Sequence, residues 1–254
     1  MKLHYQDSGE GHPLIIIHGL FGSADNWRSM ARYFSRYYRV ISVDLRNHGR
    51  SPHSDTQDFA SMAADIEQLC GDLGLHKVHV LGHSLGGKVA MQFAAEQSAW
   101  VEKLVVVDIS PRRYFSEHTP LMDAMLALDL KKLDSRSAVD AALADTVTDK
   151  SVRQFLLMNL QSGDEGLYWR INLPALKANY PQLMAPVCEN ATVSANSLFV
   201  YGSLSEYVTD DDRALIRQQF PQAQFQAIEK AGHWVHAERP QQFKQVVEEF
   251  LAND

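Results

Sequence analysis

Residues 77–87 read Lys77-Val78-His79-Val80-Leu81-Gly82-His83-Ser84-Leu85-Gly86-Gly87, an apolar run followed by Gly-x-Ser-x-Gly. A strand, this motif and a helix in succession are typical of a nucleophile elbow, a sharp turn that exposes a serine hydroxyl. Glycines at 82 and 86 allow the tight backbone path. A serine hydroxyl is a weak nucleophile unless a base lies beside it. The stretch therefore predicts Ser84 as a nucleophile and requires partners elsewhere in the chain.

Outward from this motif, short apolar runs rich in β-branched residues alternate with helical patterns. Continuous apolar strands of this kind favour a parallel sheet covered on both faces, here a mostly parallel, doubly wound open sheet. In such sheets ligands bind beyond the carboxyl ends of the strands. The predicted strands are Leu14 to Ile17, Val40 to Val43, Val78 to Leu81, Leu104 to Val107 and Leu198 to Tyr201.

The alternation of strand-like and helical segments stops between about Arg112 and Ala185, where helix-compatible segments follow one another. An unstructured loop of that length is improbable in a compact domain. We therefore expect a helical cap over residues 112–185, inserted into a core formed by residues 1–111 and 186–254. The expected helices are Pro120 to Leu130, Ser137 to Val147 and Val152 to Leu160.

Serine catalysis requires a base, and histidine is the usual one. His233 stands in Ala231-Gly232-His233-Trp234, between the strand-like run Phe225 to Ile228 and the last helical pattern. A catalytic histidine is expected at that place in such a sheet. His236 is the competing candidate, but no glycine hinge precedes it, and His83 is expected to pack within the elbow.

The acid that orients the histidine is harder to assign from the sequence. Asp108 directly follows the strand Leu104 to Val107 and gives the order Ser84, Asp108, His233, as in α/β-hydrolases. The loop after Tyr201 has Ser205 where an aspartate is usual, and Glu206 follows it. Asp108 is the favoured acid, with Ser205 as its hydrogen-bond partner. Glu206 stays open as an alternative, as do Asp210, Asp211, Asp212 and the absence of any acid.

Two backbone amides are needed to stabilise the negative oxygen of a tetrahedral intermediate. The amide of Leu85, next after the nucleophile, is one expected donor. The other is the amide of Leu20, in the glycine-containing loop that follows the first buried strand. His18 in that loop is expected to order the backbone.

Composition excludes several classes of protein. The chain has 254 residues, 45% of them hydrophobic, and a formal net charge of −7 without a block of basic residues. These values favour one sizeable core and no nucleic-acid partner. The apolar run Leu14 to Ile17 is too short for a signal sequence or a membrane span, which predicts a cytoplasmic protein. Cys70 and Cys188 lack metal-ligand spacing, and neither a metal nor an organic cofactor is expected.

With these motifs in register, the chain resembles the α/β-hydrolase superfamily over nearly its full length. Within it, the chain is similar to the branch of small bacterial esterases that includes YbfF and its mitochondrial relatives. The segments that carry this likeness are His18 to Ser23, Asp44 to Ser51, Ile109-Ser110-Pro111 and Gly232 to His236.

The resemblance implies hydrolysis of small-molecule carboxylic esters with short acyl chains, and thioesters such as acyl-CoA are further candidates. Other serine hydrolases that carry a cap, such as C–C bond hydrolases, perhydrolases and iminopeptidases, are alternatives, because specificity resides in the cap and pocket. A receptor that keeps the hydrolase shell without turnover is the alternative from another class. The sequence does not define the oligomeric state.

Overall fold

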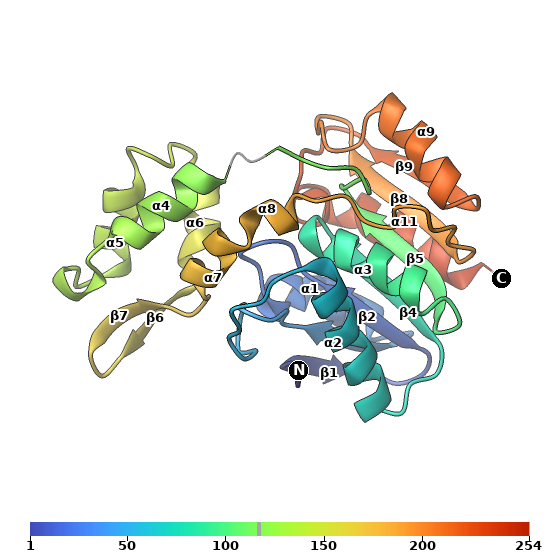
Figure 1. The fold of residues 1–254 in the computed structure, drawn as a ribbon, viewed down its shortest axis with the longest axis horizontal. Coiled ribbons are helices and arrows are strands. Elements are labelled where there is room, and N and C mark those ends of the chain that lie inside the picture. The colour runs from blue at the N-terminus through green and yellow to red at the C-terminus, as the bar shows by residue number, and fades with distance from the viewer. Residues whose placement is uncertain (116–117, 254) are drawn as a thin grey trace.

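The computed structural model describes residues 1–115 and 118–253. Seven strands form one sheet in the order β1-β3-β2-β4-β5-β8-β9 (Figure 1). All neighbouring strands run parallel except β1, which pairs antiparallel with β3 at the edge. The doubly wound, mostly parallel sheet predicted from the apolar runs is confirmed. Its strands are β1 (Tyr5–Ser8), β2 (Pro13–Ile17), β3 (Arg39–Val43), β4 (Val78–His83), β5 (Val101–Val107), β8 (Asn196–Gly202) and β9 (Ala223–Ile228).

Helices cover both faces of the sheet, and each face has its own apolar core. On one face α1 (Arg28–Phe34) and α11 (Pro240–Ala252) pack on the strands. On the other lie α2 (Phe59–Asp72), α3 (Leu85–Glu96) and α9 (Asp210–Gln219). The short helices η1 (Ala24–Trp27) and α10 (Val235–Glu238) follow β2 and β9. Because the central strands are buried on both sides, their sequences are continuously apolar rather than alternating.

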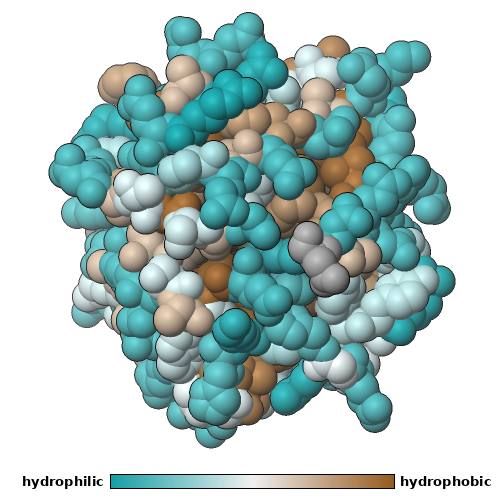
Figure 2. Space-filling view, turned by 90° about the vertical axis from the view of Figure 1, so that its right-hand side faces the viewer, coloured by the Kyte–Doolittle hydropathy of each residue, from teal (hydrophilic) through white to brown (hydrophobic). Residues whose placement is uncertain are grey.

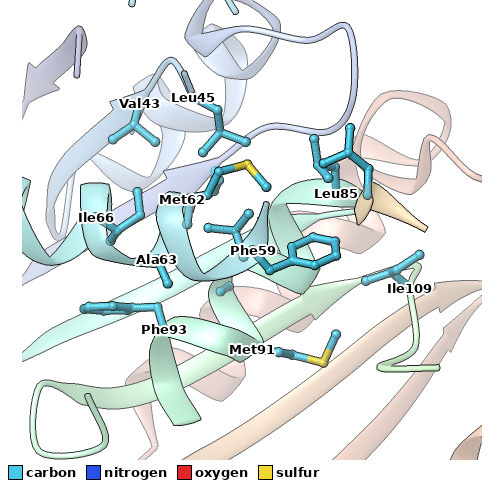
Figure 3. Packing of buried hydrophobic residues seen from close by; sticks show 14 of the residues in the cluster. Val43, Leu45, Phe59, Met62, Ala63, Ile66, Leu85, Met91, Phe93 and Ile109 are labelled. Carbon is cyan, nitrogen blue, oxygen red and sulfur yellow. The ribbon is translucent and has the colours of Figure 1, made fainter. Parts of the chain in front are cut away.

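The helix that follows Ser84, α3, is held in place by packing against α2. Phe59, Met62 and Ile66 of α2 belong to the same buried cluster as Phe93 of α3 (Figure 3). All four side chains are buried. Each buried side chain of this size contributes about 1.5–3 kcal/mol through removal from water. This packing fixes the helix that begins next to Ser84.

The segment between β5 and β8 forms a separate group of elements beside the sheet, at the left of Figure 1. The three helices expected there are present, with ends shifted by a few residues. The structure also contains a two-stranded antiparallel hairpin, β6 with β7. The segment contains α4 (Thr119–Ala127), η2 (Leu130–Lys132), α5 (Arg136–Leu143), α6 (Lys150–Leu157), β6 (Leu160–Gly163), β7 (Gly166–Trp169), α7 (Leu173–Ala178) and α8 (Tyr180–Leu183).

The hairpin corrects the expectation that strands are missing from residues 112–185. Along β7 the side chains of Leu167 and Trp169 are half-buried, and Tyr168 between them is exposed. This is the alternation of a strand. Strands of four residues are too short for such a pattern to be distinguished from a helical turn in the sequence. Gly166, at a φ of 111°, marks the turn.

The two chain segments that lead into and out of this insertion run side by side. The amide of Val187 donates to the carbonyl of Pro111 at 2.9 Å, and the amide of Tyr114 donates to the carbonyl of Met184 at 2.9 Å. The segment between β5 and β8 therefore leaves and re-enters the sheet region at one place.

Lys88 of α3 joins both of these connecting segments to the elbow helix. Its Nζ donates to the carbonyl of Arg112 at 2.7 Å and to the carbonyl of Ala185 at 2.6 Å. The side chain is almost completely buried, and that burial lowers its pKa to about 7. One side chain thus holds the first and last residues of the insertion against the helix that begins after Ser84.

Figure 2 shows the surface of the molecule from the right-hand side of Figure 1. Hydrophilic side chains surround apolar patches of limited size there. Among the described residues, none of the helices combines the length and the apolar character that crossing a lipid bilayer requires.

Candidate active site

Ser84 lies in the turn between β4 and α3, with the backbone angles expected of a strained elbow. Its φ is 53° and its ψ is −119°, a conformation that costs a non-glycine residue about 1–3 kcal/mol. A Cβ added at Gly82 would lie 2.1 Å from the carbonyl oxygen of Gly86, and one added at Gly86 would lie 2.4 Å from that of His18. Both glycines are therefore required by close backbone contacts, and Ser84 lines a cavity at the carboxyl end of the sheet.

His233 and Asp108 meet at this end of the sheet, although 125 residues separate them in the chain. The Nδ1 atom of His233 lies 2.7 Å from the Oδ2 atom of Asp108, which is fully buried at the end of β5. A carboxylate accepts hydrogen bonds, so Nδ1 carries the proton. This leaves the lone pair of Nε2 as the basic position of the ring. His233 lines the same cavity as Ser84.

The carboxylate of Asp108 receives two more hydrogen bonds from the loop after β8. The Ser205 hydroxyl donates to Oδ2 at 2.5 Å, and the Gly202 amide donates to Oδ1 at 3.1 Å. The ring of Tyr207 stacks on that of His233, with 4.1 Å between centroids. Three donors therefore fix the carboxylate, and the stacked ring fixes the imidazole. Sequence reasoning missed the contribution of Tyr207, because stacking depends on the path of the loop.

The other acids considered from the sequence have different partners or positions. Asp212 is buried and forms an ion pair with Arg112, whose Nε lies 2.7 Å from Oδ1. Asp210 pairs with Arg213 at the surface. Glu206 is exposed at the rim of the cavity, and Asp211 is exposed on α9. Among the described residues, the carboxylate that forms a hydrogen bond with the His233 ring is that of Asp108.

His236, the competing base, is buried against an aromatic residue. Its ring stacks on that of Trp27, with centroids 4.1 Å apart and an interplanar angle of 16°. The residue is 8% exposed. This arrangement is that of a packed core side chain.

The orientation of the Leu20 amide follows from the hydrogen bonds of the preceding carbonyl. The Gly19 oxygen accepts from His18 Nδ1 at 2.7 Å and from the Gly22 amide at 3.0 Å. In a trans peptide the C=O and the N–H point in opposite directions. The Leu20 N–H is therefore directed away from these donors. A Cβ added at Gly19 would lie 3.3 Å from that of Ser84, so this peptide borders the nucleophile.

The same geometry applies to the Leu85 amide. The carbonyl of Ser84 accepts from the amides of Gly87 and Lys88 at 2.9 and 3.1 Å, inside the first turn of α3. The Leu85 N–H points the opposite way, out of the helix N-terminus, where amides lack an intrahelical acceptor. Leu20 and Leu85 both line the cavity with Ser84.

Two buried histidines hold these loops in place. The Nε2 atom of His18 accepts the Leu45 amide at 3.0 Å, so its Nδ1 is the donor to Gly19. His83 binds the carbonyl of His233 through Nε2 at 2.9 Å. Burial is the main cause that lowers the pKa of both rings. Each acts as a neutral hydrogen-bonding group that orders the backbone.

The loop from Asp44 to Ser51 connects the sheet to the insertion. Asn47 has a φ of 64°, and its carbonyl accepts the amide of Asn172 at 3.0 Å. The two asparagine side chains are also joined, at 3.1 Å. A second link is the Asn159 side chain, which donates to the carbonyl of Phe21 at 2.8 Å. Asn47 belongs to a segment that carries the resemblance, but its contact with the insertion, like that of Asn159, could not be predicted because the partners lie more than 100 residues away.

The cavity has a volume of about 340 Å³ and is mostly apolar. Its lining comes from the loops of the sheet and from the insertion. The insertion side chains that face it include Leu121, Val152, Phe155, Leu156 and Leu183. The insertion thus supplies apolar walls, and the sheet supplies the residues with reactive groups.

The buried histidines predict a loss of stability in acid. The pKa values of His48 and His236 are lowered to about 3, mainly by burial. An unfolded chain binds a proton at a histidine near pH 6.5. Between about pH 6.5 and 3 the unfolded state therefore binds more protons, and stability falls as the pH falls, by up to ~1.4 kcal/mol per pH unit and histidine. Urea unfolding at neutral pH and at about pH 5 measures this loss.

A matched pair of variants tests the cause of that loss. His236→Phe keeps an aromatic ring against Trp27 but removes a titrating group, so its stability depends less steeply on pH. The exposed His76 gives the control, His76→Asn, which keeps the slope of the unmodified protein. Equal slopes for all three proteins would contradict the assignment.

Comparison with known proteins places this geometry among hydrolases. Residues 12–240 match the family model described as alpha/beta hydrolase fold. The chain is 37% identical to the sn-1-specific diacylglycerol lipase ABHD11 of Danio rerio, covering 97% of this chain and 80% of that protein. It is 33% identical to the esterase YbfF of Escherichia coli, covering 97% and 95% of the two chains. The solved structure of a marine microorganism esterase superposes with a TM-score of 0.95 at 37% identity, covering 98% of this chain and 99% of that one.

Proposed function

Because the chain belongs to the alpha/beta hydrolase fold family and is a carboxylic ester hydrolase, we propose that it cleaves esters of short acyl chains through an acyl-enzyme on Ser84. The observation that carries this proposal is the hydrogen bond of 2.7 Å between His233 and the buried Asp108, beside an apolar cavity that Ser84 also lines. The chemistry needs the hydroxyl, the imidazole and the carboxylate, and the cavity holds the acyl group.

In the first half of the proposed reaction the Ser84 oxygen attacks the ester carbonyl and its proton moves to Nε2 of His233. Asp108 keeps Nδ1 protonated and stabilises the imidazolium by its charge. The amides of Leu20 and Leu85 donate to the oxygen that becomes negative. Each such donor lowers the barrier by roughly 2.7–4 kcal/mol.

The tetrahedral intermediate then collapses, the bond to the alcohol oxygen breaks, and the imidazolium gives its proton to the departing alkoxide. Water repeats the sequence on the acyl-enzyme, with His233 as base, and releases the carboxylic acid and free Ser84. Ser205 acts through Asp108, by holding the carboxylate oxygen that faces the imidazole.

The preference for short acyl groups rests on the size and walls of the cavity. Its volume of about 340 Å³ lies near the lower end of the range usual for ligand pockets, which is roughly 300–1,000 Å³. Apolar side chains of the insertion form part of the wall. We propose that residues 112–185 act as a cap whose walls limit chain length.

A panel of p-nitrophenyl esters from acetate to dodecanoate, with acetyl-CoA and butyryl-CoA, tests the substrate class. We expect kcat/KM to be highest from acetate to hexanoate and to fall at least about tenfold by decanoate, because longer chains do not fit the cavity and one methylene too many changes binding by about 1–3 kcal/mol. Turnover of the CoA compounds would extend the class to thioesters. A rate that rises steadily to dodecanoate would contradict the proposal and favour a lipase that acts on long chains.

Two cap variants locate the determinant of chain length. Phe155→Ala enlarges the cavity, so the optimum moves toward longer esters. Tyr168→Ala is the matched control, because Tyr168 is an exposed aromatic residue of the same insertion that does not line this cavity. If the preferred chain length shifted in both variants, or in neither, the cavity walls would not explain the preference.

A further inference from the structure

Three potential metal ligands meet at the amino end of the sheet, opposite the candidate active site. They are His12, just before β2, His79 in β4 and Glu102 in β5. Their ligand atoms all lie within 4.8 Å of one another. The Nε2 atom of His12 is 3.3 Å from Oε2 of Glu102, and the two imidazole rings are 4.2 Å apart between centroids.

A β-bulge creates this arrangement. In the pairing of β4 with β5, Val78 faces Val101 and His79 faces Lys103, so Glu102 is the extra residue. Such an insertion bends the strand and redirects a side chain. Glu102 has no paired residue on β4, and its side chain lies near His12 and His79.

Two nitrogen atoms of this cluster are buried without a hydrogen-bond partner among the described residues. They are Nδ1 of His79 and Nε2 of His12, and the latter is close to Oε2 of Glu102, at 3.3 Å, without forming a hydrogen bond to it. The His79 residue is only 5% exposed. A buried polar atom that has no partner costs about 1–3 kcal/mol. Two such atoms beside a carboxylate indicate a group that binds all three.

We propose that His12, His79 and Glu102 form a site for a divalent transition-metal ion, with zinc as the best fit. Two imidazole nitrogens and one carboxylate are a common ligand set for zinc, and water supplies the fourth position. At bond lengths of about 2.0–2.1 Å, tetrahedral ligand atoms lie roughly 3.3 Å apart. The pair His12 and Glu102 already has this separation. Both side chains are partly exposed and can rotate to close the remaining distance to the fixed His79.

The nearest lysine limits the affinity of the site without blocking it. Lys103 pairs with His79 across the strands, and its charge acts on that ring. Its ammonium group donates to the carbonyls of Phe250 and Leu251 at the end of α11, and also to that of Asn253. The carboxylate of Glu102 balances part of this positive charge. We expect weaker binding than at a closed structural zinc site with four protein ligands.

The expected effect of the ion is on stability. It would join the beginnings of β2, β4 and β5, the three strands whose carboxyl ends lead to the Leu20 loop, Ser84 and Asp108. Because these ends lie across the sheet from the ion, the metal takes no part in ester hydrolysis. The inference is independent of the proposed reaction.

The test uses the full chain, freed of metal with a chelator and titrated with zinc chloride by calorimetry. Binding is followed in parallel through the melting temperature. At a free zinc concentration of roughly 100 times Kd, we expect the melting temperature to rise by about 5–10 °C. Cobalt in place of zinc should give the visible absorption of a tetrahedral site.

Variants decide whether the ion sits at these residues. Glu102→Gln and His12→Asn, both at partly exposed positions, should weaken binding at least about tenfold and abolish most of the thermal shift. Glu10→Gln and His76→Asn change an exposed glutamate and an exposed histidine outside the cluster and should keep both effects. Absence of binding, or binding that survives Glu102→Gln and His12→Asn, would overturn the proposal, and neither result depends on esterase activity.

Discussion

We expect Ser84→Ala to lower kcat for a short ester by about 10⁶-fold and to abolish covalent labelling by a fluorophosphonate. In the proposed reaction the hydroxyl is the group that forms the acyl-enzyme, and alanine has no group to replace it. The amides of Leu20 and Leu85 remain, so a residual acceleration of roughly 10³-fold over water is expected. Steady-state kinetics and mass spectrometry of the labelled protein measure the two effects.

The fold should survive this substitution. Alanine differs from serine by one hydroxyl, and it occupies the same strained backbone conformation at about the same cost. We therefore expect an unchanged circular dichroism spectrum and a melting temperature within a few degrees of the original. A folded Ser84→Ala protein that retains ester turnover would contradict an acyl-enzyme on Ser84. Failure of the unmodified protein to take up the label would contradict it too and would favour a receptor without turnover.

Asp108→Asn lowers kcat by about 10⁴-fold, the second largest effect expected. An amide at this position can donate to Nδ1 of His233, which moves the imidazole proton to Nε2. The ring then cannot accept the proton of Ser84, and the charge that stabilises the imidazolium is lost. The expected change is in kcat more than in KM, because Asp108 is buried and does not line the cavity.

Glu206→Gln is the matched control for this assignment. Glu206 is the nearest alternative acid in the sequence and lines the cavity, but it is exposed. We expect its removal to change kcat less than about fivefold, as for a surface charge in a water-exposed position. Reversed results, with a large loss in Glu206→Gln and a small one in Asp108→Asn, would transfer the role of the acid to Glu206.

The sheet could be predicted from the sequence because its central strands are apolar along their whole length. The runs of β2, β3, β4, β5 and β8 were identified, and helical patterns between them implied parallel pairing. The edge strand β1 was missed. Its residues are half-buried or exposed and carry no apolar signal, so its place depends on pairing with β3.

The nucleophile and the base of the candidate site could be predicted because the sequence next to each of them determines the local backbone geometry. A glycine pair around Ser84 is needed for any elbow, and the glycine next to His233 marks a loop in the neighbourhood of the last strand. The acid is different, because the carboxylate at the end of β5 lies 125 positions before His233 and Glu206 after β8 lies 27 positions before it, so sequence separation does not identify the partner of the histidine. Only the packing of the two strands side by side brings Asp108 to Nδ1.

The cluster of His12, His79 and Glu102 shows the same limit more strongly. Its residues are separated by 67 and 23 positions along the chain, which matches no metal-binding motif with short spacing. The bulge that directs the Glu102 side chain toward the histidines arises from the pairing of β4 with β5. The sequence predicted no metal ligands, and a proposal for them required the register of three strands.

The hydrogen bonds of Lys88 have a consequence for how this protein can diversify. Because Lys88 holds both junctions of the insertion against α3, we expect that the segment between them can be exchanged while the reacting groups keep their positions, provided that the contacts of Asn159 and Asn172 with the sheet loops are kept. Grafting the corresponding segment of a relative between residues 112 and 185 would then exchange substrate range and leave the chemistry untouched. In the proposed reaction the insertion provides walls that recognise the acyl group, the loops of the sheet carry the reacting groups, and Lys88 is one of the side chains that join the two parts.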